Sequence, residues 1–162
     1  MTAVPKLDRI DRKILVALQT DARLTNQALS ERVALSPSAC LARVRRLERE
    51  GVIQGYHARL DPFTLGIGLV LYADISLEGH SPAELAAFEK AIAAIPQVVE
   101  ASHVTGVFDY ILKVAVTDMA EWTSIAERLA SADLGVERIN SHVVMRKPKV
   151  FVGYPSDDPS AS

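Results

Sequence analysis

The chain has 162 residues, of which 49% are apolar, a formal net charge of −2 and a single cysteine, Cys40. This composition is sufficient for hydrophobic cores, and it excludes a disulfide framework and a multi-cysteine metal site. The longest uncharged apolar run, residues 65–73, is too short to span a bilayer, and no signal-peptide pattern begins the chain, so we expect a cytoplasmic protein without a membrane partner.

Charge is divided unevenly along the chain. Residues 1–60 carry eleven Lys and Arg against six Asp and Glu, or +5, whereas residues 61–162 carry seven against fourteen, or −7. A change of sign between the two parts indicates a basic module that binds a polyanion, joined to an acidic part with a different task.

Three short helices are predicted in the first sixty residues. Asp8, Thr25 and Ser36 each precede a run with one apolar face and can cap its N-terminus. Gly51 is the expected end of the third helix. Only a tight turn at residues 34–35 separates the second and third helices, and this arrangement is typical of a helix-turn-helix.

The third predicted helix, residues 36–50, has two faces of different character. At about 100° per residue, its apolar positions share the face that packs on the other helices, so Cys40 is expected in the core. The opposite face has small residues followed by arginines, which suits close approach to a DNA groove. The expected DNA contacts are Ser36, Ser38, Ala39, Arg43, Arg46 and Arg49. Of these, Ser38, Ala39 and Arg43 are expected at base edges, and Arg46 and Arg49 at phosphates.

A solvated charged face is the alternative interpretation of this helix. Glu48 and Glu50 dilute its positive charge, and Arg45 can pair with Glu48. The two preceding helices and the uneven charge of the chain favour DNA binding instead.

Residues 7–56, LDRIDRKILVALQTDARLTNQALSERVALSPSACLARVRRLEREGVIQGY, resemble the DNA-binding domain of the leucine-responsive regulator/AsnC (Lrp/AsnC) family of transcription factors. The similarity is densest in residues 36–56. The resemblance implies a winged-helix-like helix-turn-helix domain and a β-hairpin hinge after it. The residues of that hinge are typical of a strand, a turn at residues 61–62 and a break at Gly66. The predicted parts are residues 1–52 for DNA binding, 53–66 for the hinge, 67–152 for regulation and assembly, and 153–162 for a flexible tail.

The second part of the chain contains an internal repeat at an offset of 37 residues. Two helix-capping patterns, two apolar helix faces and two strand starts coincide; the paired positions are Ser81 and Asp118, Glu84 and Glu121, Phe88 and Ile125, Ile92 and Leu129, and Val99 and Val136. Each copy is typical of strand, helix, strand. Two such units predict an α+β fold, a ferredoxin-like βαββαβ sandwich with both helices on one face of the sheet. The other face needs a cover, which indicates a partner subunit, and the Lrp/AsnC regulatory domain has this arrangement.

Between the two copies, Gly106, Val107, Phe108, Asp109 and Tyr110 resemble the family's Gly-x-x-Asp-Tyr motif, which implies an amino-acid effector bound between regulatory domains. Asp109 supplies the negative charge that an α-ammonium needs, and Gly106 can expose neighbouring backbone N–H groups to a carboxylate. A plain β-turn, with Asp109 bonded to its own backbone, is the alternative. Relatives carry Thr-x-Thr where this chain has Ile139 and Ser141, so Ser141 is expected to contact the effector with one hydroxyl fewer.

These patterns predict a sequence-specific DNA-binding transcriptional regulator whose assembly or DNA affinity an amino acid or related effector modulates. The predicted partners are double-stranded DNA, the effector, and the protein itself as a homodimer and a higher assembly such as an octamer; no cofactor or metal is expected. An architectural DNA-binding protein without ligand response is the alternative, and a stand-alone amino-acid sensor leaves the arginine helix unexplained. Residues 66–68 form a Gly-x-Gly that precedes a strand, so no enzyme is expected.

Overall fold

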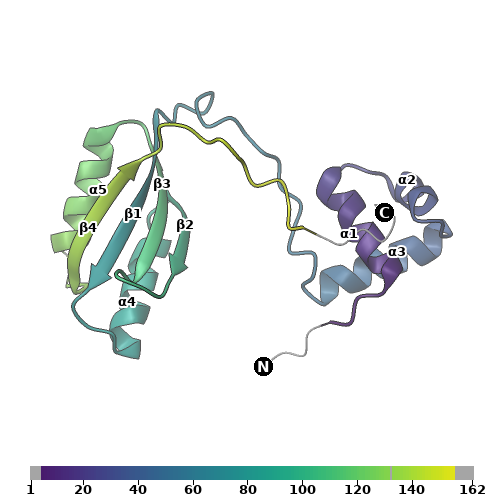
Figure 1. Cartoon of the computed structure of the whole chain (residues 1–162), viewed down its shortest axis with the longest axis horizontal. Coiled ribbons are helices and arrows are strands. Elements are labelled where there is room, and N and C mark those ends of the chain that lie inside the picture. The colour runs from purple at the N-terminus through teal and green to yellow at the C-terminus, as the bar shows by residue number, and fades with distance from the viewer. Residues whose placement is uncertain (1–4, 132, 156–162) are drawn as a thin grey trace. The chain divides into compact units, whose positions relative to one another are not determined.

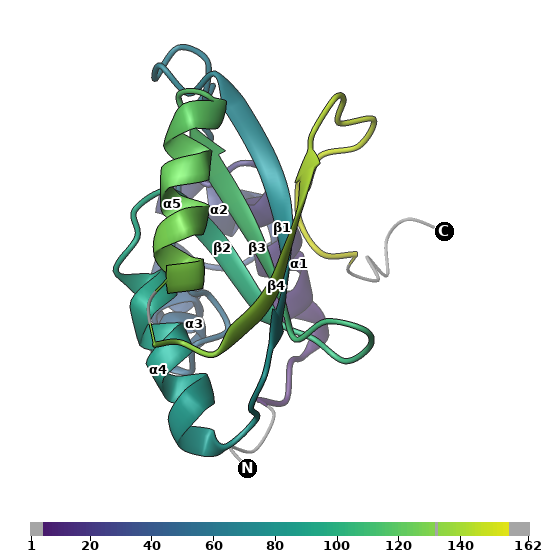
Figure 2. The same cartoon turned by 90° about the vertical axis from the view of Figure 1, so that its left-hand side faces the viewer.

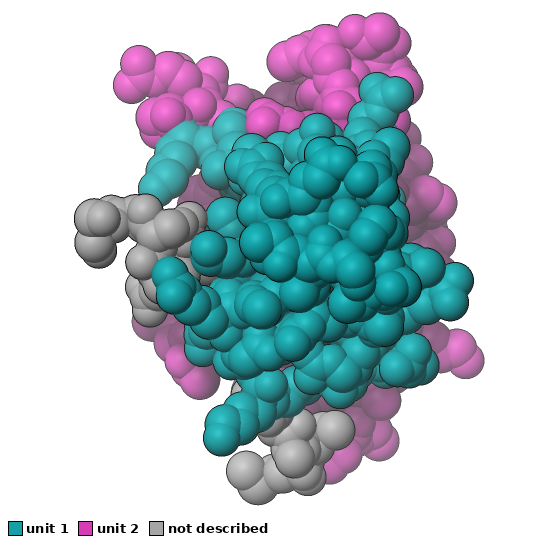
Figure 3. Space-filling view, turned by 90° about the vertical axis from the view of Figure 1, so that its right-hand side faces the viewer, with its two compact units in different colours: residues 1–58, 149–162 teal, residues 59–148 magenta. Residues whose placement is uncertain are grey.

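The structure is a computed structural model, and it describes residues 5–131 and 133–155. The described chain divides into two compact units: one comprises residues 5–58 and 149–155, and the other residues 59–131 and 133–148 (Figures 1 and 3). In the described ranges, no helix has the length and apolar character needed to cross a membrane.

The first unit contains the three predicted helices, α1 (Arg9–Thr20), α2 (Asn26–Arg32) and α3 (Pro37–Arg49) (Figure 1). The side chains of the predicted caps all accept a backbone N–H at the start of their helices. The helices enclose a small core of buried residues, Ile14, Ala17, Leu29, Val33, Cys40 and Leu47. Cys40 is fully buried, which confirms the prediction that it belongs to the core.

The turn between α2 and α3 is tight because α2 ends in a Schellman motif. The Leu35 N–H donates to the Ser30 carbonyl at 2.9 Å, and the Ala34 N–H donates to the Glu31 carbonyl at 3.3 Å. Ala34 therefore takes a left-handed conformation, with φ of 56°, that glycine usually supplies. Gly51, with φ of 70°, ends α3 by the same motif, as the sequence predicts.

The segment that follows α3 differs from its prediction. No strand forms between residues 51 and 68, so the strand expected at the start of the hinge is wrong for the described chain. A strand needs a hydrogen-bonded neighbour, and the backbone of residues 54–60 has none there. The predicted turn does form: the Leu65 and Ile67 N–H groups donate to the Pro62 carbonyl, and Asp61 caps the turn.

The second unit is a four-stranded antiparallel sheet in the order β2-β3-β1-β4, with two helices. Its elements are β1 (Leu69–Leu77), α4 (Pro82–Ala93), β2 (Val98–His103), β3 (Tyr110–Val116), α5 (Met119–Ser131) and β4 (Val136–Val143). Both helices cover the same face of the sheet (Figure 2). This order and layering confirm the predicted ferredoxin-like fold.

The core of the second unit lies between the sheet and the two helices, and the repeat is visible in it. Phe88 and Ile92 of α4 and Ile125 and Leu129 of α5 are all buried at matching positions. The capping patterns differ in one detail. The Ser81 and Glu84 side chains form a complete capping box, whereas the Glu121 carboxylate accepts from the Thr117 N–H and hydroxyl instead.

Among residues 59–131 and 133–148, no helix covers the face of the sheet opposite α4 and α5 (Figure 2). It carries apolar side chains beside charged ones; the residues are Val70, Tyr72, Asp74, Glu100, Ile111, Lys113, Ala115, Arg138 and His142. His142 Nε2 lies 2.8 Å from Asp74 Oδ2, and Lys113 Nζ lies 3.4 Å from Glu100 Oε2. These polar pairs link neighbouring strands across the open face.

The last described residues belong with the first unit. The Gln19 side-chain amide and the Tyr154 backbone exchange two hydrogen bonds, of 2.7 and 3.1 Å. Tyr154 is thus attached to α1, although it falls in the predicted flexible tail. Residues 156–162 of that tail lie outside the described residues.

Candidate DNA-binding helix and effector loop

The N-terminal end of α3 is fixed by local hydrogen bonds. Ser36 Oγ accepts from the Ala39 N–H at 3.2 Å and lies 3.2 Å from Ser38 Oγ. Asn26 Nδ2 of α2 donates to the Pro37 carbonyl at 2.8 Å, which joins the two helices at their turn. Ser38 and Ala39 are exposed, as a base-contacting position requires.

The arginines of α3 fall into two groups. Arg43 Nη1 lies 2.6 Å from Asp8 Oδ2 and 2.9 Å from Asp11 Oδ1, and Arg46 Nη2 lies 2.6 Å from Asp11 Oδ2. Arg45 is exposed and, like Arg49, takes part in no ion pair within the described residues. The predicted DNA contacts Arg43 and Arg46 are therefore already held by carboxylates at the start of α1. Arg49 makes no such contact within the described residues.

Arg45 was not among the contacts expected from the sequence, although the helical period places it on the side of α3 that faces away from Cys40. Arg45 and Arg49 lie about 140° and 180° around the helix from buried Cys40, whereas Arg43 lies only about 60° away. A position about 60° from Cys40 borders a neighbouring helix, whereas positions about 140° to 180° away meet solvent. This angular offset was the available signal.

The carboxylates that hold Arg43 and Arg46 also cap α1. Asp8 and Asp11 form a capping box, each accepting the other's backbone N–H. Burial raises the pKa of Asp11, but hydrogen bonds from Arg46, the Asp8 N–H and Arg43 outweigh it, so this pKa lies below its ordinary value. The pKa of Asp8 is lowered by the Asp11 N–H and by Arg43. Both carboxylates are thus charged at neutral pH.

In the second unit, Asp109 joins the β2–β3 loop to the end of β1. Its Oδ2 accepts from the Leu77 N–H at 2.8 Å, and its Oδ1 lies 2.8 Å from His80 Nε2. The hydrogen bond from Leu77 lowers the pKa of Asp109 against the opposing effect of burial, and His80 lowers it further. The carboxylate is therefore a fixed negative charge, bonded to other segments and not to its own turn.

The other loop residues are arranged differently from one another. Gly106 has φ of 136° with open space around it, Val107 is 83% exposed, and Phe108 is half-buried. Tyr110 is buried: its ring lies 4.8 Å from that of Phe88, and its hydroxyl donates to Glu89 at 3.0 Å. Burial raises the pKa of Tyr110 to about 12, with the Glu89 contact adding to it. Gly106 and Val107 are thus the exposed part of the loop, Phe108 and Asp109 are half-buried, and Tyr110 is part of the core.

Ser141, the sixth expected effector residue, lies on β4 and faces the helices. Its Oγ accepts a hydrogen bond from Trp122 Nε1 at 2.9 Å, and its backbone pairs with Ala73. The structure therefore gives the Ser141 hydroxyl a partner in α5. No hydrogen bond among the described residues joins Ser141 to residues 106–109.

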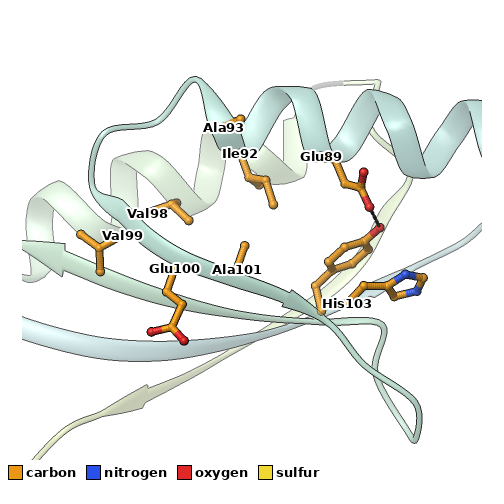
Figure 4. A pocket seen from close by; sticks show the side chains of 9 residues that line it. Glu89, Ile92, Ala93, Val98, Val99, Glu100, Ala101 and His103 are labelled. Carbon is orange, nitrogen blue, oxygen red and sulfur yellow. Dashed lines mark hydrogen bonds between the residues drawn. The ribbon is translucent and has the colours of Figure 1, made fainter. Parts of the chain in front are cut away.

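A hollow of about 390 Å³ lies between α4 and β2 (Figure 4). Its lining includes Glu89, Ile92 and Glu100, together with His103, whose ring stacks on that of Tyr110 at 4.6 Å. Tyr110, the last residue of the predicted effector loop, also lines this hollow, whereas residues 106–109 do not.

A three-helix unit with arginines on an exposed recognition helix, followed by an α+β unit with a charged loop, defines a DNA-binding regulator with a ligand-binding domain. Comparisons with known proteins agree. Residues 7–54 match the family described as winged helix-turn-helix DNA-binding, and residues 70–152 match the Lrp/AsnC ligand binding domain. The chain belongs to the Lrp/AsnC family of transcriptional regulators.

Individual relatives support the same conclusion over nearly the whole chain. The leucine-responsive regulatory proteins of Klebsiella pneumoniae and Escherichia coli are 43% identical to it over 143 residues, covering 88% of this chain and 87% of theirs. A transcriptional regulator from Neisseria meningitidis, solved as its complex with L-Met, is 35% identical, with a TM-score of 0.85 and coverage of 93% and 97%. An AsnC family regulator from Agrobacterium tumefaciens is 32% identical, with a TM-score of 0.83 and coverage of 92% and 97%.

Proposed function

We propose that α3 enters the major groove of double-stranded DNA and reads base edges with its N-terminal part, as recognition helices do. The predicted contacts Ser36, Ser38, Ala39, Arg43, Arg46 and Arg49 stand as part of this proposal, and Arg45 is added to them. The support is the exposed outer side of α3, where small side chains precede arginines. The site of action is the cytoplasm, and the role is regulation without catalysis.

An amino acid or a close relative of one is the effector, and it binds at Gly106, Val107, Phe108, Asp109 and Tyr110 between subunits, with Ser141 nearby. The observation that carries this proposal is the Asp109 carboxylate, a charge fixed by Leu77 and His80 at an exposed loop. A carboxylate in that position suits an α-ammonium. The L-Met complex of the Neisseria relative supports an amino acid as the class of ligand.

The regulatory units assemble through the open face of their sheets into a homodimer and then a higher assembly such as an octamer. The support is the apolar and charged face of the sheet that lies opposite α4 and α5 (Figure 2). Because half-sites must match the spacing of two recognition helices, an effector that favours one assembly changes DNA affinity.

Thermal shifts of the pure protein with each common amino acid test the effector proposal. A ligand that binds only the folded state raises the unfolding midpoint by mass action. Asp109→Asn keeps an acceptor for the Leu77 N–H but removes the charge, so it is expected to abolish the shift. His80→Ala removes the other partner of the Asp109–His80 hydrogen bond and keeps the Asp109 charge, so the thermal shift of this variant should survive. A wild-type shift that persists in Asp109→Asn removes this loop from the proposal.

One observation favours an architectural DNA-binding protein without ligand response as a second candidate. The Ser141 hydroxyl is bonded to Trp122, and Ile139 packs against the core, so neither is free for an effector. The same thermal scan decides: no shift with any amino acid, together with intact DNA binding, supports the architectural role.

A further inference from the structure

A neutral cluster of four charges joins α3 to the start of α1. Asp11 is 1% exposed and contacts Arg43 at 2.9 Å and Arg46 at 2.6 Å, one with each carboxylate oxygen. Asp8 adds a second contact to Arg43 at 2.6 Å. Two carboxylates and two guanidiniums cancel, so the cluster contributes little net field toward a DNA phosphate.

The cluster also resists rearrangement. If Arg43 or Arg46 turned toward a phosphate, the buried Asp11 carboxylate would lose a partner, and an uncompensated buried charge is strongly unfavourable. The side chains of Arg43 and Arg46 are about one-third exposed, at 31% and 34%. Arg46 additionally lies 3.8 Å from Glu50. These two arginines are therefore attached to the protein on the side of α3 that borders α1.

The remaining arginines of α3 have the opposite surroundings. Arg45 and Arg49 are exposed, lie four residues apart on one side of the helix, and make no ion pair within the described residues. Ser38 and Ala42 share this outer side and are small enough to let the backbone approach a groove. These guanidiniums lose no protein contact when they meet DNA.

We propose that Asp11 is a positioning residue, which holds Arg43 and Arg46 so that they fix α3 against α1, while Arg45 and Arg49 make the phosphate contacts. The proposal rests on the DNA-binding function proposed above and refines it. It reassigns Arg43 from a base edge and Arg46 from a phosphate to support of the helix. It also gives the α1 capping box a role in DNA binding.

The test is the salt dependence of binding to a fluorescein-labelled mixed-sequence duplex, measured by anisotropy with the full chain. Arg45→Ala and Arg49→Ala are each expected to reduce the log–log slope by about 0.9, the value for one phosphate contact, without changing the thermal midpoint. Arg43→Ala and Arg46→Ala are expected to lower the midpoint and weaken binding without that loss of slope. Arg128→Ala, at an exposed position of α5 in the second unit, is the control. It removes one positive charge outside the DNA-binding unit and should change neither the slope nor the thermal midpoint.

Asp11→Asn separates the positioning role from a role in stability alone. Loss of stability alone would lower the thermal midpoint but would not change the salt-dependence slope. It releases Arg46, while Arg43 keeps its contact with Asp8, so the slope on mixed-sequence DNA should steepen by about 0.9 even though the thermal midpoint falls. A slope unchanged in Asp11→Asn overturns the positioning role. Should this variant not fold, a loss of slope in Arg43→Ala or Arg46→Ala with an unchanged midpoint overturns the proposal by itself. A wild-type chain without salt-dependent binding overturns the DNA-binding function, and the midpoints of the Arg43 and Arg46 variants still test the cluster.

Discussion

At the scale of single residues, Asp11 is the only charged side chain that is buried among the described residues. Because its pKa lies below the ordinary value of 3.8, its charge stabilises the folded state at and above that pH. This contribution is lost as pH falls below 3.8 and through the lowered pKa. Asp11→Asn is expected to cost about 2 kcal/mol at neutral pH, less than the roughly 3–5 kcal/mol for breaking a fully buried pair, because the arginines stay partly exposed.

The same variant should flatten the acid side of the stability curve. Urea unfolding at neutral pH and at about pH 3 measures both effects, since the wild-type advantage already shrinks below pH 3.8. Glu137→Gln, at an exposed position of β4, is the charge-matched control. An Asp11→Asn deficit that is equally large at both pH values would contradict this account.

Ser141 allows a second test at this scale. Trp122 is 2% exposed and donates its indole N–H to the Ser141 hydroxyl. Ser141→Ala leaves that buried donor without a partner, so we expect a loss of about 1–2 kcal/mol in the free energy of unfolding without any effector. Denaturant titration measures it, and Ser124→Ala, at an exposed position of α5 away from the open sheet face, is the control. An unchanged unfolding free energy would return the hydroxyl to an effector role.

The residue types of both sites were readable from the sequence, but their partners were not. Arg43 and Asp11 are 32 residues apart, and their contact depends on how α1 crosses α3. Asp109 likewise bonds to Leu77, 32 residues earlier, because β3 pairs with β1. Long-range contacts of this kind follow from tertiary packing, which helix capping and periodicity do not encode.

At the scale of elements, the Schellman motif of α2 contains a strained position. Ala34 has φ of 56°, a conformation that costs a non-glycine residue about 1–2 kcal/mol. Glycine removes this cost but gains entropy in the unfolded chain worth about 0.4–1 kcal/mol. Ala34→Gly is therefore expected to stabilise the first unit by about 0.5–1 kcal/mol, measured as a higher urea midpoint. Ala42→Gly, within α3, should destabilise it by a similar amount; stabilisation by both variants would contradict the argument.

Elements that depend on short-range interactions were predicted correctly from the sequence, and the element that depends on a distant neighbour was not. Helix starts were recovered because Asp8, Thr25 and Ser36 act on backbone groups within a few residues. The strands of the second unit were recovered because the 37-residue repeat shows each pattern twice. The hinge strand was not, since a strand depends on a neighbour that an isolated pattern does not reveal.

At the scale of the whole molecule, the open face of the sheet predicts a dimer that one substitution can disrupt. Tyr72 is 39% exposed near the middle of β1, directly opposite Lys113 and His142 on the flanking strands. In Tyr72→Glu, these basic neighbours can accommodate the new carboxylate, so the single chain should still fold. In a two-fold interface the charge is buried twice, and we expect about 3 kcal/mol of lost association, roughly a hundredfold in the dissociation constant. Sedimentation velocity across a concentration series measures this change.

The control is Ser124→Asp, at an exposed position of α5. It adds the same charge to the helical side of the sheet and should leave the dimer intact. If Tyr72→Glu associates like the wild type while Ser124→Asp does not, the subunits meet through their helices, and the open face must be covered by something other than a second copy.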